Sequence, residues 1–300
     1  MGHPLQRLRL RVDPPDEIAP RRHLEPIAHP DKSGSYTERN HAQMSNTSQW
    51  KEVWEKRFGK DISDHQIDRG TLLRNEAIET LSNEECVRFI EPQPDEVVFD
   101  AGCGSGVNMS LVQSKVKRII GMDYSSGALA RCHSRILEGK FVNVDLIQGD
   151  VTQLAIPSHC VDKVLCMSVF HYLNDAEVRL ALREFARILV HQGTVVLHVK
   201  NLSSLYLSTL RLAKKIKQLL GGQSAPEHFR SFRWYINELE SCGFEVVYYH
   251  SFNVFLIERM PRIVRHLLQR FELEHYSQFP LRTALIRRHG YDLKIRAKLT

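Results

Sequence analysis

The chain has 300 residues, 42% of them apolar, and a formal net charge of +6. This length and composition allow a sizeable buried core, in one large domain or in one domain with extra segments. No run approaches the roughly 20 apolar residues that span a bilayer, and the N-terminus has arginines without the apolar segment of a secretory signal. The six cysteines are scattered, with no CxxC pair, which predicts reduced thiols in a cytoplasmic protein and indicates neither a disulfide framework nor a zinc site.

The first third of the chain is predicted to change from irregular to helical. Residues 1–46 contain six prolines and four histidines without periodicity, so we expect a disordered or flexible N-terminal segment. Residues 47–94 are expected to form helices, the first over 48–58 with Ser48 as N-cap and the second over 71–89. Trp50, Trp54 and Phe58 share one face of the first helix, which favours ordinary core packing.

Residues 96–106 are the most informative stretch. A β-favouring run ends at Asp100, glycines follow at alternate positions, and a segment suited to a helix begins at Asn108. This order is typical of a nucleotide-type site at the carboxyl edge of a parallel sheet, because glycine lets a ligand approach the main chain. Val107 stands where a dinucleotide fingerprint has its third glycine, and a P-loop lysine is absent. Asp100 would repel a pyrophosphate and suits a cationic ligand.

Strands and helices then alternate, which predicts a doubly wound α/β core. Strands are expected near 96–101, 117–122, 144–148, 162–167 and 193–199, helices near 126–137 and 176–190, and a turn at 191–193. A helix over 232–242, stopped by Gly243, precedes terminal strands near 244–250 and 291–298. The second strand ends at Asp123, whose carboxylate can accept two hydrogen bonds from a ribose diol. The third strand is followed by a Gly-Asp turn at Asp150.

These landmarks, over about residues 95–200, resemble the motifs of the class I S-adenosylmethionine (SAM)-dependent methyltransferases, of the type that acts on small molecules. The resemblance implies a Rossmann-like seven-stranded sheet whose last strand is antiparallel, with helical lid insertions. It implies a methyltransferase domain over 47–300, with the SAM-binding core at 95–200 and acceptor-side lid helices and terminal strands at 201–300. It also offers an alternative for the 48–58 helix, as a cover over the bound cofactor.

The same resemblance assigns SAM as the cofactor. The glycine turn would lie against its methionine part, Asp123 would bind the ribose, Asp150 would contact the adenine amino group, and Val151 would offer a backbone N–H. The complete set of residues expected to bind the cofactor is Asp100, Ala101, Gly102, Cys103, Gly104, Gly106, Asn108, Asp123, Tyr124, Asp150, Val151, Met167 and Ser168.

Three histidines are candidates for acid–base chemistry. Methyl transfer from a sulfonium mainly requires positioning, and a base is needed only when the acceptor must lose a proton. His171 follows the fourth strand, His198 lies near the end of the fifth, and His228 lies in the segment 226–232. A structural role is the alternative for each of them. Tyr172, Asn174 and Asp175 are alternative catalytic residues in the loop of His171.

The last third of the chain is basic, with 16 Lys and Arg against 8 Asp and Glu in residues 201–300. Its stretches 203–220 and 261–271 read as basic amphipathic helices, interpreted as a lid over an acceptor pocket, with peripheral membrane contact as the alternative. The predicted function is O-, N- or C-methylation of a small, partly apolar acceptor, without a DNA partner or a structural metal. One alternative function is methylation of RNA or protein, although no RNA-binding module is recognisable. A second alternative is a non-catalytic scaffold that docks to a membrane or a partner.

Overall fold

The structure is a computed structural model that describes residues 46–60, 87–139, 141–204, 228–252 and 292–300. The chain divides into two units, residues 1–42 and 43–300, and every described residue belongs to the second. Most of the expected flexible segment, most of the second expected helix and nearly all of the two basic stretches lie outside the described residues. No helix in the described part is long and apolar enough to cross a lipid bilayer.

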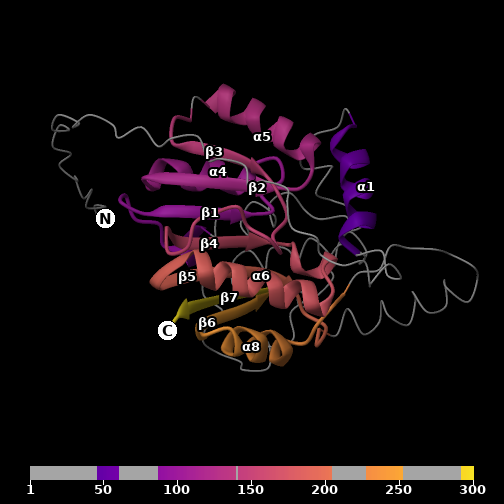
Figure 1. Cartoon of the computed structure of the whole chain (residues 1–300), viewed down its shortest axis with the longest axis vertical. Coiled ribbons are helices and arrows are strands. Elements are labelled where there is room, and N and C mark those ends of the chain that lie inside the picture. The colour runs from indigo at the N-terminus through magenta and orange to yellow at the C-terminus, as the bar shows by residue number, and fades with distance from the viewer. Residues whose placement is uncertain (1–45, 61–86, 140, 205–227, 253–291) are drawn as a thin grey trace, which may run out of the picture. The chain divides into compact units, whose positions relative to one another are not determined.

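A seven-stranded sheet forms the centre of the second unit, in the order β3-β2-β1-β4-β5-β7-β6 (Figure 1). The parallel strands are β1 (Val97–Ala101), β2 (Arg118–Asp123), β3 (Val144–Gln148), β4 (Val161–Met167) and β5 (Leu189–Lys200). β7 (Asp292–Leu299) lies between β5 and β6 (Phe244–Phe252) and is antiparallel to both. The expected doubly wound, seven-stranded sheet with an antiparallel last strand is confirmed.

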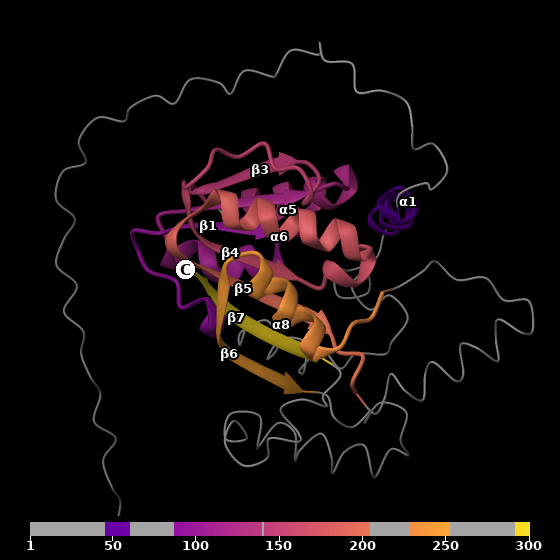
Figure 2. The ribbon, with the colours of Figure 1, turned by 60° about the horizontal axis from the view of Figure 1, so that its bottom comes forward.

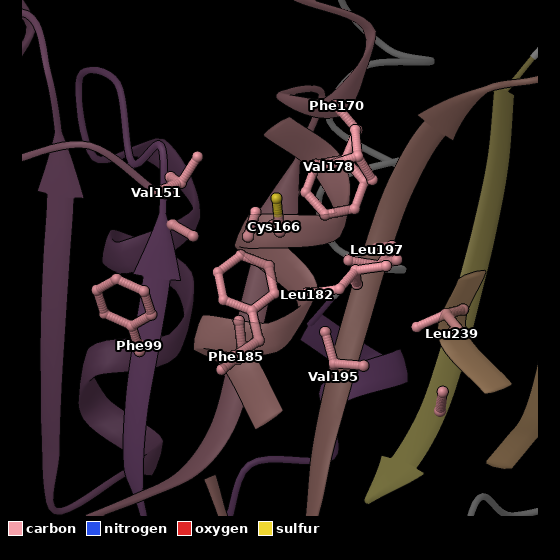
Figure 3. Close-up of a cluster of buried hydrophobic side chains, with 14 of the residues drawn as sticks. Phe99, Val151, Cys166, Phe170, Val178, Leu182, Phe185, Val195, Leu197 and Leu239 are labelled. Carbon is pink, nitrogen blue, oxygen red and sulfur yellow. The ribbon is translucent and has the colours of Figure 1, made fainter. Parts of the chain in front are cut away.

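Helices cover both faces of the sheet. On one face α4 (Val107–Val112) and α5 (Ser126–Gly139) bury Met109 and Cys132 against Val98 and Leu165. On the other face lie α6 (Asp175–Ile188) and α8 (Phe232–Ser241), which run over the same side of the sheet in Figure 2. Figure 3 shows the core beneath them, where Phe185 of α6 faces the side chains of the central strands. Burying such a side chain contributes about 1.5–3 kcal/mol.

Local sequence signals explain where the helices begin and end. At α6, the Asn174 side chain accepts from the backbone of Glu177 while the Glu177 side chain accepts from the backbone of Asn174, which is a capping box. At α8, the Ser231 side chain accepts from Trp234 N. That helix ends just before Gly243, whose φ of 84° suits glycine. The expected stop at Gly243 is therefore confirmed.

The start of α1, the end of α6 and the start of β5 differ from the expectations. Helix α1 (Asn46–Phe58) begins at Asn46, so Ser48 lies inside it and is not its N-cap. Helix α6 ends at Ile188 because Leu189 already pairs with Val161 of β4. The turn expected at 191–193 thus lies inside β5, next to a register shift between β4 and β5.

Candidate functional site

The glycine turn after β1 is held firmly against β2. Gly102 N and Cys103 N both donate to Met122 O, at 2.8 and 2.9 Å. A Cβ added to Gly102, whose φ is 75°, would lie 2.4 Å from Val169 Cγ2, so the turn packs tightly against the loop after β4. At Gly104, with φ of 54°, the nearest described atom to such a Cβ is Phe58 Cζ at 3.8 Å. The backbone at Gly104 is therefore the part of the turn that a ligand can approach.

Asp123 lies at the tip of β2 beside this turn. Its Oδ2 accepts from Gly104 N at 3.0 Å, and its Oδ1 accepts from Ser125 N at 2.9 Å. Burial raises the pKa of the Asp123 carboxyl, and the backbone hydrogen bonds from Ser125 and Gly104 act in the opposite direction. The structure thus brings Asp123 and the glycine turn together at one edge of the sheet, as the ribose prediction requires.

Three of the residues expected to bind the cofactor have buried polar atoms without a hydrogen-bond partner in the described structure. They are both carboxylate oxygens of Asp100, Oδ1 of Asn108 and the hydroxyl of Tyr124. Asp100 is only 1% exposed, and its burial, together with the charge of Asp123, raises its pKa to about 7. Buried polar groups are almost always hydrogen-bonded in folded proteins. These groups therefore fit a polar, positively charged ligand that would supply their partners.

The remaining residues of the predicted set have structural contacts of their own. Oδ1 of Asp150 accepts from both the backbone N and the hydroxyl of Thr152, at 2.8 and 2.7 Å, which closes the turn after β3. Val151 contributes its side chain to the core, and Ala101 is fully buried. Gly106 is the N-cap of α4, with φ of 80°, and Met167 is the partly buried last residue of β4. Their roles toward a cofactor stay predictions.

Helix α1 lies at the carboxyl ends of the parallel strands (Figure 1). The rings of Trp50 and Tyr172 are 4.5 Å apart, so α1 packs on the short helix η2 (Phe170–Tyr172). Glu55 accepts from Ser126 N at 2.8 Å and Gly127 N at 3.2 Å, which ties α1 to the start of α5. Burial acts to raise the pKa of Glu55, but these hydrogen bonds outweigh it and lower the pKa. Glu55 was not among the expected site residues.

His171 and His228 lie next to each other beyond β4. His228 N donates to His171 O at 2.8 Å. His171 is buried in η2, with its ring centroid 3.9 Å from that of Tyr172. Burial and then the charge of Arg230 lower the pKa of His228. The structure thus brings two of the three candidate histidines to the loop that packs on the glycine turn.

Arg230 holds this loop in place, although it was not among the expected site residues. Its side chain is buried and donates to Phe170 O at 2.8 Å and to Leu173 O at 2.6 Å. It also donates to Asp175 Oδ1 at 2.7 Å. Its position two residues after His228 was the sequence signal that could have pointed to it.

His198, the third candidate, belongs to a separate buried network. Its Nδ1 lies 3.0 Å from Ser168 Oγ, and its Nε2 lies 3.0 Å from Asp292 Oδ1. Lys200 also contacts the Asp292 carboxylate. Asp292 had no sequence signal, because the pairing of β7 with β5 is set by the tertiary fold.

The geometry agrees with the comparisons with known proteins. Residues 98–193 match the family model of the methyltransferase domain. This region is a methyltransferase domain, and the relatives that match it are SAM-dependent methyltransferases. A probable SAM-dependent methyltransferase of Mycobacterium tuberculosis is 31% identical over 104 residues, which cover 35% of each chain. A ubiquinone/menaquinone biosynthesis C-methyltransferase of Campylobacter jejuni is 29% identical over 53% of this chain and 74% of that protein.

Solved methyltransferase structures share the fold. Geranyl diphosphate C-methyltransferase from Streptomyces coelicolor superposes with a TM-score of 0.58 at 12% identity, over 86% of this chain and 99% of the other. The match to the mycobacterial methyltransferase spans about a third of that protein's length. No group of three or more His, Cys, Asp or Glu side chains in the described ranges of this methyltransferase could hold a metal ion.

Proposed function

We propose that this chain transfers a methyl group from SAM to a small acceptor. The observation that carries the proposal is the buried Asp100 carboxylate, which has no hydrogen-bond partner among the described residues and stands beside the glycine turn and Asp123. SAM supplies a methyl group on a positively charged sulfur that departs as a neutral thioether. A cationic ligand would stabilise the ionised form of Asp100, since opposite charges favour each other's charged states.

The chain's own residues would hold the cofactor from several strands. Asp123 offers acceptor oxygens to ribose hydroxyls, and the backbone at Gly104 allows close approach of the ligand. Asn108 and Tyr124 offer buried polar atoms without described partners. Asp150 would contact the adenine end from the carboxyl end of β3, and Ser168 and Met167 would border the crevice from β4.

The acceptor would bind beyond β4, where aromatic rings gather. Tyr172 lies against Trp50 and His171, and the His171 ring stacks on Phe229 with centroids 6.5 Å apart. These rings support a small, partly apolar acceptor. The relatives named above include two C-methyltransferases, and O-, N- and C-methylation all belong to the proposal. Burial and then the charge of Arg230 lower the pKa of His228, which favours its neutral imidazole.

The alternative functions depend largely on parts of the chain that are not described. An RNA or protein acceptor, a membrane contact and a scaffold role all rest on the basic residues of 201–300, and they stay predictions. A cytoplasmic location belongs to the main proposal, and the described cysteines are all outside disulfides, which agrees with it.

Calorimetric titration of the folded full chain with SAM and with S-adenosylhomocysteine tests the cofactor. Binding of both is expected, and no binding to protein with a folded circular dichroism spectrum would refute the proposal. Methyl-labelled SAM is then incubated with the protein and fractionated cell extract, followed by mass spectrometry. We expect label in a small molecule. Label in RNA or protein would favour the alternative acceptor instead.

A further inference from the structure

We propose that Ser168, His198 and Asp292 form a proton relay that takes the proton of the methyl acceptor. The relay rests on the proposed function and gives it a specific base. Ser168 is the catalytic residue that touches the acceptor, His198 stores the proton, and Asp292 is a positioning residue. His171 and His228, which lie beyond the same strand, are then not the base.

With Asp292 ionised and the His198 ring neutral, the two printed contacts favour one arrangement of hydrogens. His198 Nε2 lies 3.0 Å from Asp292 Oδ1, and an ionised carboxylate only accepts, so Nε2 carries the hydrogen. Nδ1 is then an acceptor, and it lies 3.0 Å from Ser168 Oγ. The Ser168 hydroxyl therefore donates to His198, which donates to Asp292. In this order the Ser168 hydroxyl can pass its own hydrogen to His198 while its oxygen takes up a proton from the methyl acceptor.

The relay starts at the carboxyl end of β4 and ends in the interior. Ser168 directly follows β4, is partly buried, and has a φ of 59°, which is rare for a serine. Its backbone N donates to His198 O at 2.9 Å, which fixes the hydroxyl beside the ring. The next residue, Val169, is the one that packs on Gly102 of the glycine turn. His198 and Asp292 are only 3% and 1% exposed.

The charges around His198 favour a ring that is neutral at rest. Lys200 of β5 contacts the same Asp292 carboxylate, so its positive charge balances the negative one. Lys294, also buried, is the register partner of His198 on β7, and Met167 is the partner on β4. Burying ionisable groups is costly, and well-packed apolar side chains would stabilise this sheet region at least as well. The network is therefore better explained by chemistry than by stability.

The proposed step balances in protons and electrons. As the acceptor atom bonds to the methyl carbon, the carbon–sulfur bond breaks and its electron pair stays on sulfur. The acceptor's proton passes to Ser168 Oγ while the hydrogen of the Ser168 hydroxyl passes to His198 Nδ1. Asp292 stays ionised and stabilises the imidazolium, which returns its proton to water before the next turnover. That proton leaves through the Ser168 hydroxyl, and the cycle requires no reactant besides this water.

The test combines histidine nitrogen NMR of the full chain, saturated with S-adenosylhomocysteine, with calorimetry of the same samples. The variants are Ser168→Ala, His198→Gln and Asp292→Asn. His191→Gln, an exposed position at the other end of β5, is the matched control. His198→Gln identifies the resonances of His198. We expect a neutral ring with hydrogen on Nε2 at pH 8, reversible protonation at lower pH, and a shifted Nδ1 resonance in Ser168→Ala.

Kinetic measurements supply a second readout. They use as substrate the cell-extract fraction in which labelling finds the methyl acceptor. Ser168→Ala and His198→Gln should lower kcat by about 10²–10⁴-fold, the usual range for general base catalysis. In the wild type kcat should rise with pH as His198 loses its proton, and this limb should vanish in His198→Gln. His191→Gln should match the wild type in every measurement.

Three results would overturn the relay: a His198 ring that stays doubly protonated above pH 9, a neutral ring with hydrogen on Nδ1, or a His198 spectrum unchanged in Ser168→Ala. Ser168→Ala removes one hydroxyl and keeps the backbone, so it decides the test even if Asp292→Asn does not fold. If the wild type does not bind S-adenosylhomocysteine, the proposed function fails. If it binds and any of the three results appears, only the relay fails.

Discussion

The two halves of the carboxyl edge of the sheet treat their polar groups in opposite ways. At β1 and β2, Asp100, Asn108 and Tyr124 bury polar atoms without described partners. At β4, β5 and β7, the Ser168, His198 and Asp292 side chains bond to one another. The first half would gain its missing hydrogen bonds from the proposed cofactor, and the second half is already organised.

This difference suggests that the first half determines ligand affinity and the second half supports the chemical step. A group without a partner destabilises the free protein and is stabilised by binding, so its contribution appears in ligand affinity. A preorganised network adds little on binding and instead keeps acid–base groups oriented for the reaction. Substitutions in the first half should therefore change ligand affinity, and substitutions in the second half should change the rate of the reaction. The substitutions below are ordered by the size of the change we expect, with the greatest first.

Asp123→Ala should cause the largest change in affinity. Loss of two hydrogen bonds to a charged acceptor, each about 1.5–3 kcal/mol, weakens SAM binding about 100-fold or more. Calorimetric titration measures this. Asp145→Ala is the matched control, because Asp145 is a half-exposed carboxylate on β3 that pairs with Arg118, and such pairs contribute little. Near-normal affinity of Asp123→Ala would refute the ribose assignment.

Arg230→Met should lower the free energy of unfolding by about 2–5 kcal/mol, because the carbonyls of Phe170 and Leu173 lose a buried donor. Urea unfolding measures the loss. Arg179→Met serves as the control, since Arg179 also makes two hydrogen bonds, to Glu238, but is 45% exposed. Its loss should be much smaller than that of Arg230→Met, because exposed pairs contribute little. Equal losses for the two variants would show that Arg230 does not organise the loop.

Asp100→Asn should stabilise the ligand-free protein at alkaline pH. The pKa of Asp100 rises from 3.8 to about 7 on folding, so the folded state holds its proton more tightly and wild-type stability falls as pH rises through this interval. An asparagine at this position does not titrate, so it adds no such pH dependence to the stability. The variant should be more stable than the wild type by up to ~4 kcal/mol at pH 8, with a smaller gap at pH 5.

Urea unfolding at the two pH values measures this gap, and SAM should bind the variant more weakly. An equal gap at pH 5 and pH 8 would contradict the raised pKa. A related measurement uses the wild type alone: SAM binding near pH 6.5 should release a proton, because a cation favours ionised Asp100. Calorimetry in buffers of different ionisation enthalpy detects the release.

Two alanine substitutions in the glycine turn should separate packing from ligand access. Both positions have positive φ, which costs about 1–2 kcal/mol for alanine. Gly102→Ala additionally clashes with Val169, whereas Gly104→Ala has no described atom closer than 3.8 Å. Gly102→Ala should therefore lose more stability, while Gly104→Ala should lose SAM affinity with a smaller loss of stability. Thermal unfolding measures the stability of each variant, and calorimetry measures its SAM affinity. A larger loss of stability in Gly104→Ala than in Gly102→Ala would contradict the geometry.

The sequence was sufficient for the elements whose signals are local. The β1 strand and the glycine turn were predicted because residue type and spacing specify a tight turn at a strand end. Asp123 was placed beside that turn because the carboxyl ends of neighbouring parallel strands meet at one edge. Less local features were placed less well: the end of α6 depends on pairing between Leu189 and Val161, which periodicity does not contain.

The missed residues all act over long sequence separations. Asp292 lies 94 residues from His198, Glu55 lies 71 residues from Ser126, and Arg230 lies 60 residues from Phe170. Asp292 and Glu55 were ordinary charged residues within their own segments, and for Arg230 the one signal was its nearness to His228. The role of each depends on which side chains the tertiary fold brings opposite it, and a single sequence does not specify that.

The position of β7 between β5 and β6 also has a consequence for synthesis of the chain. β6 joins the described sheet through β7 alone, and β5 has only β4 as a partner until β7 arrives. On a ribosome, which releases the chain from its N-terminal end, β5 would present an open sheet edge while the residues from 201 to 291 are made. Such edges invite wrong pairing with other chains, so this interval is when the nascent protein would gain most from a chaperone.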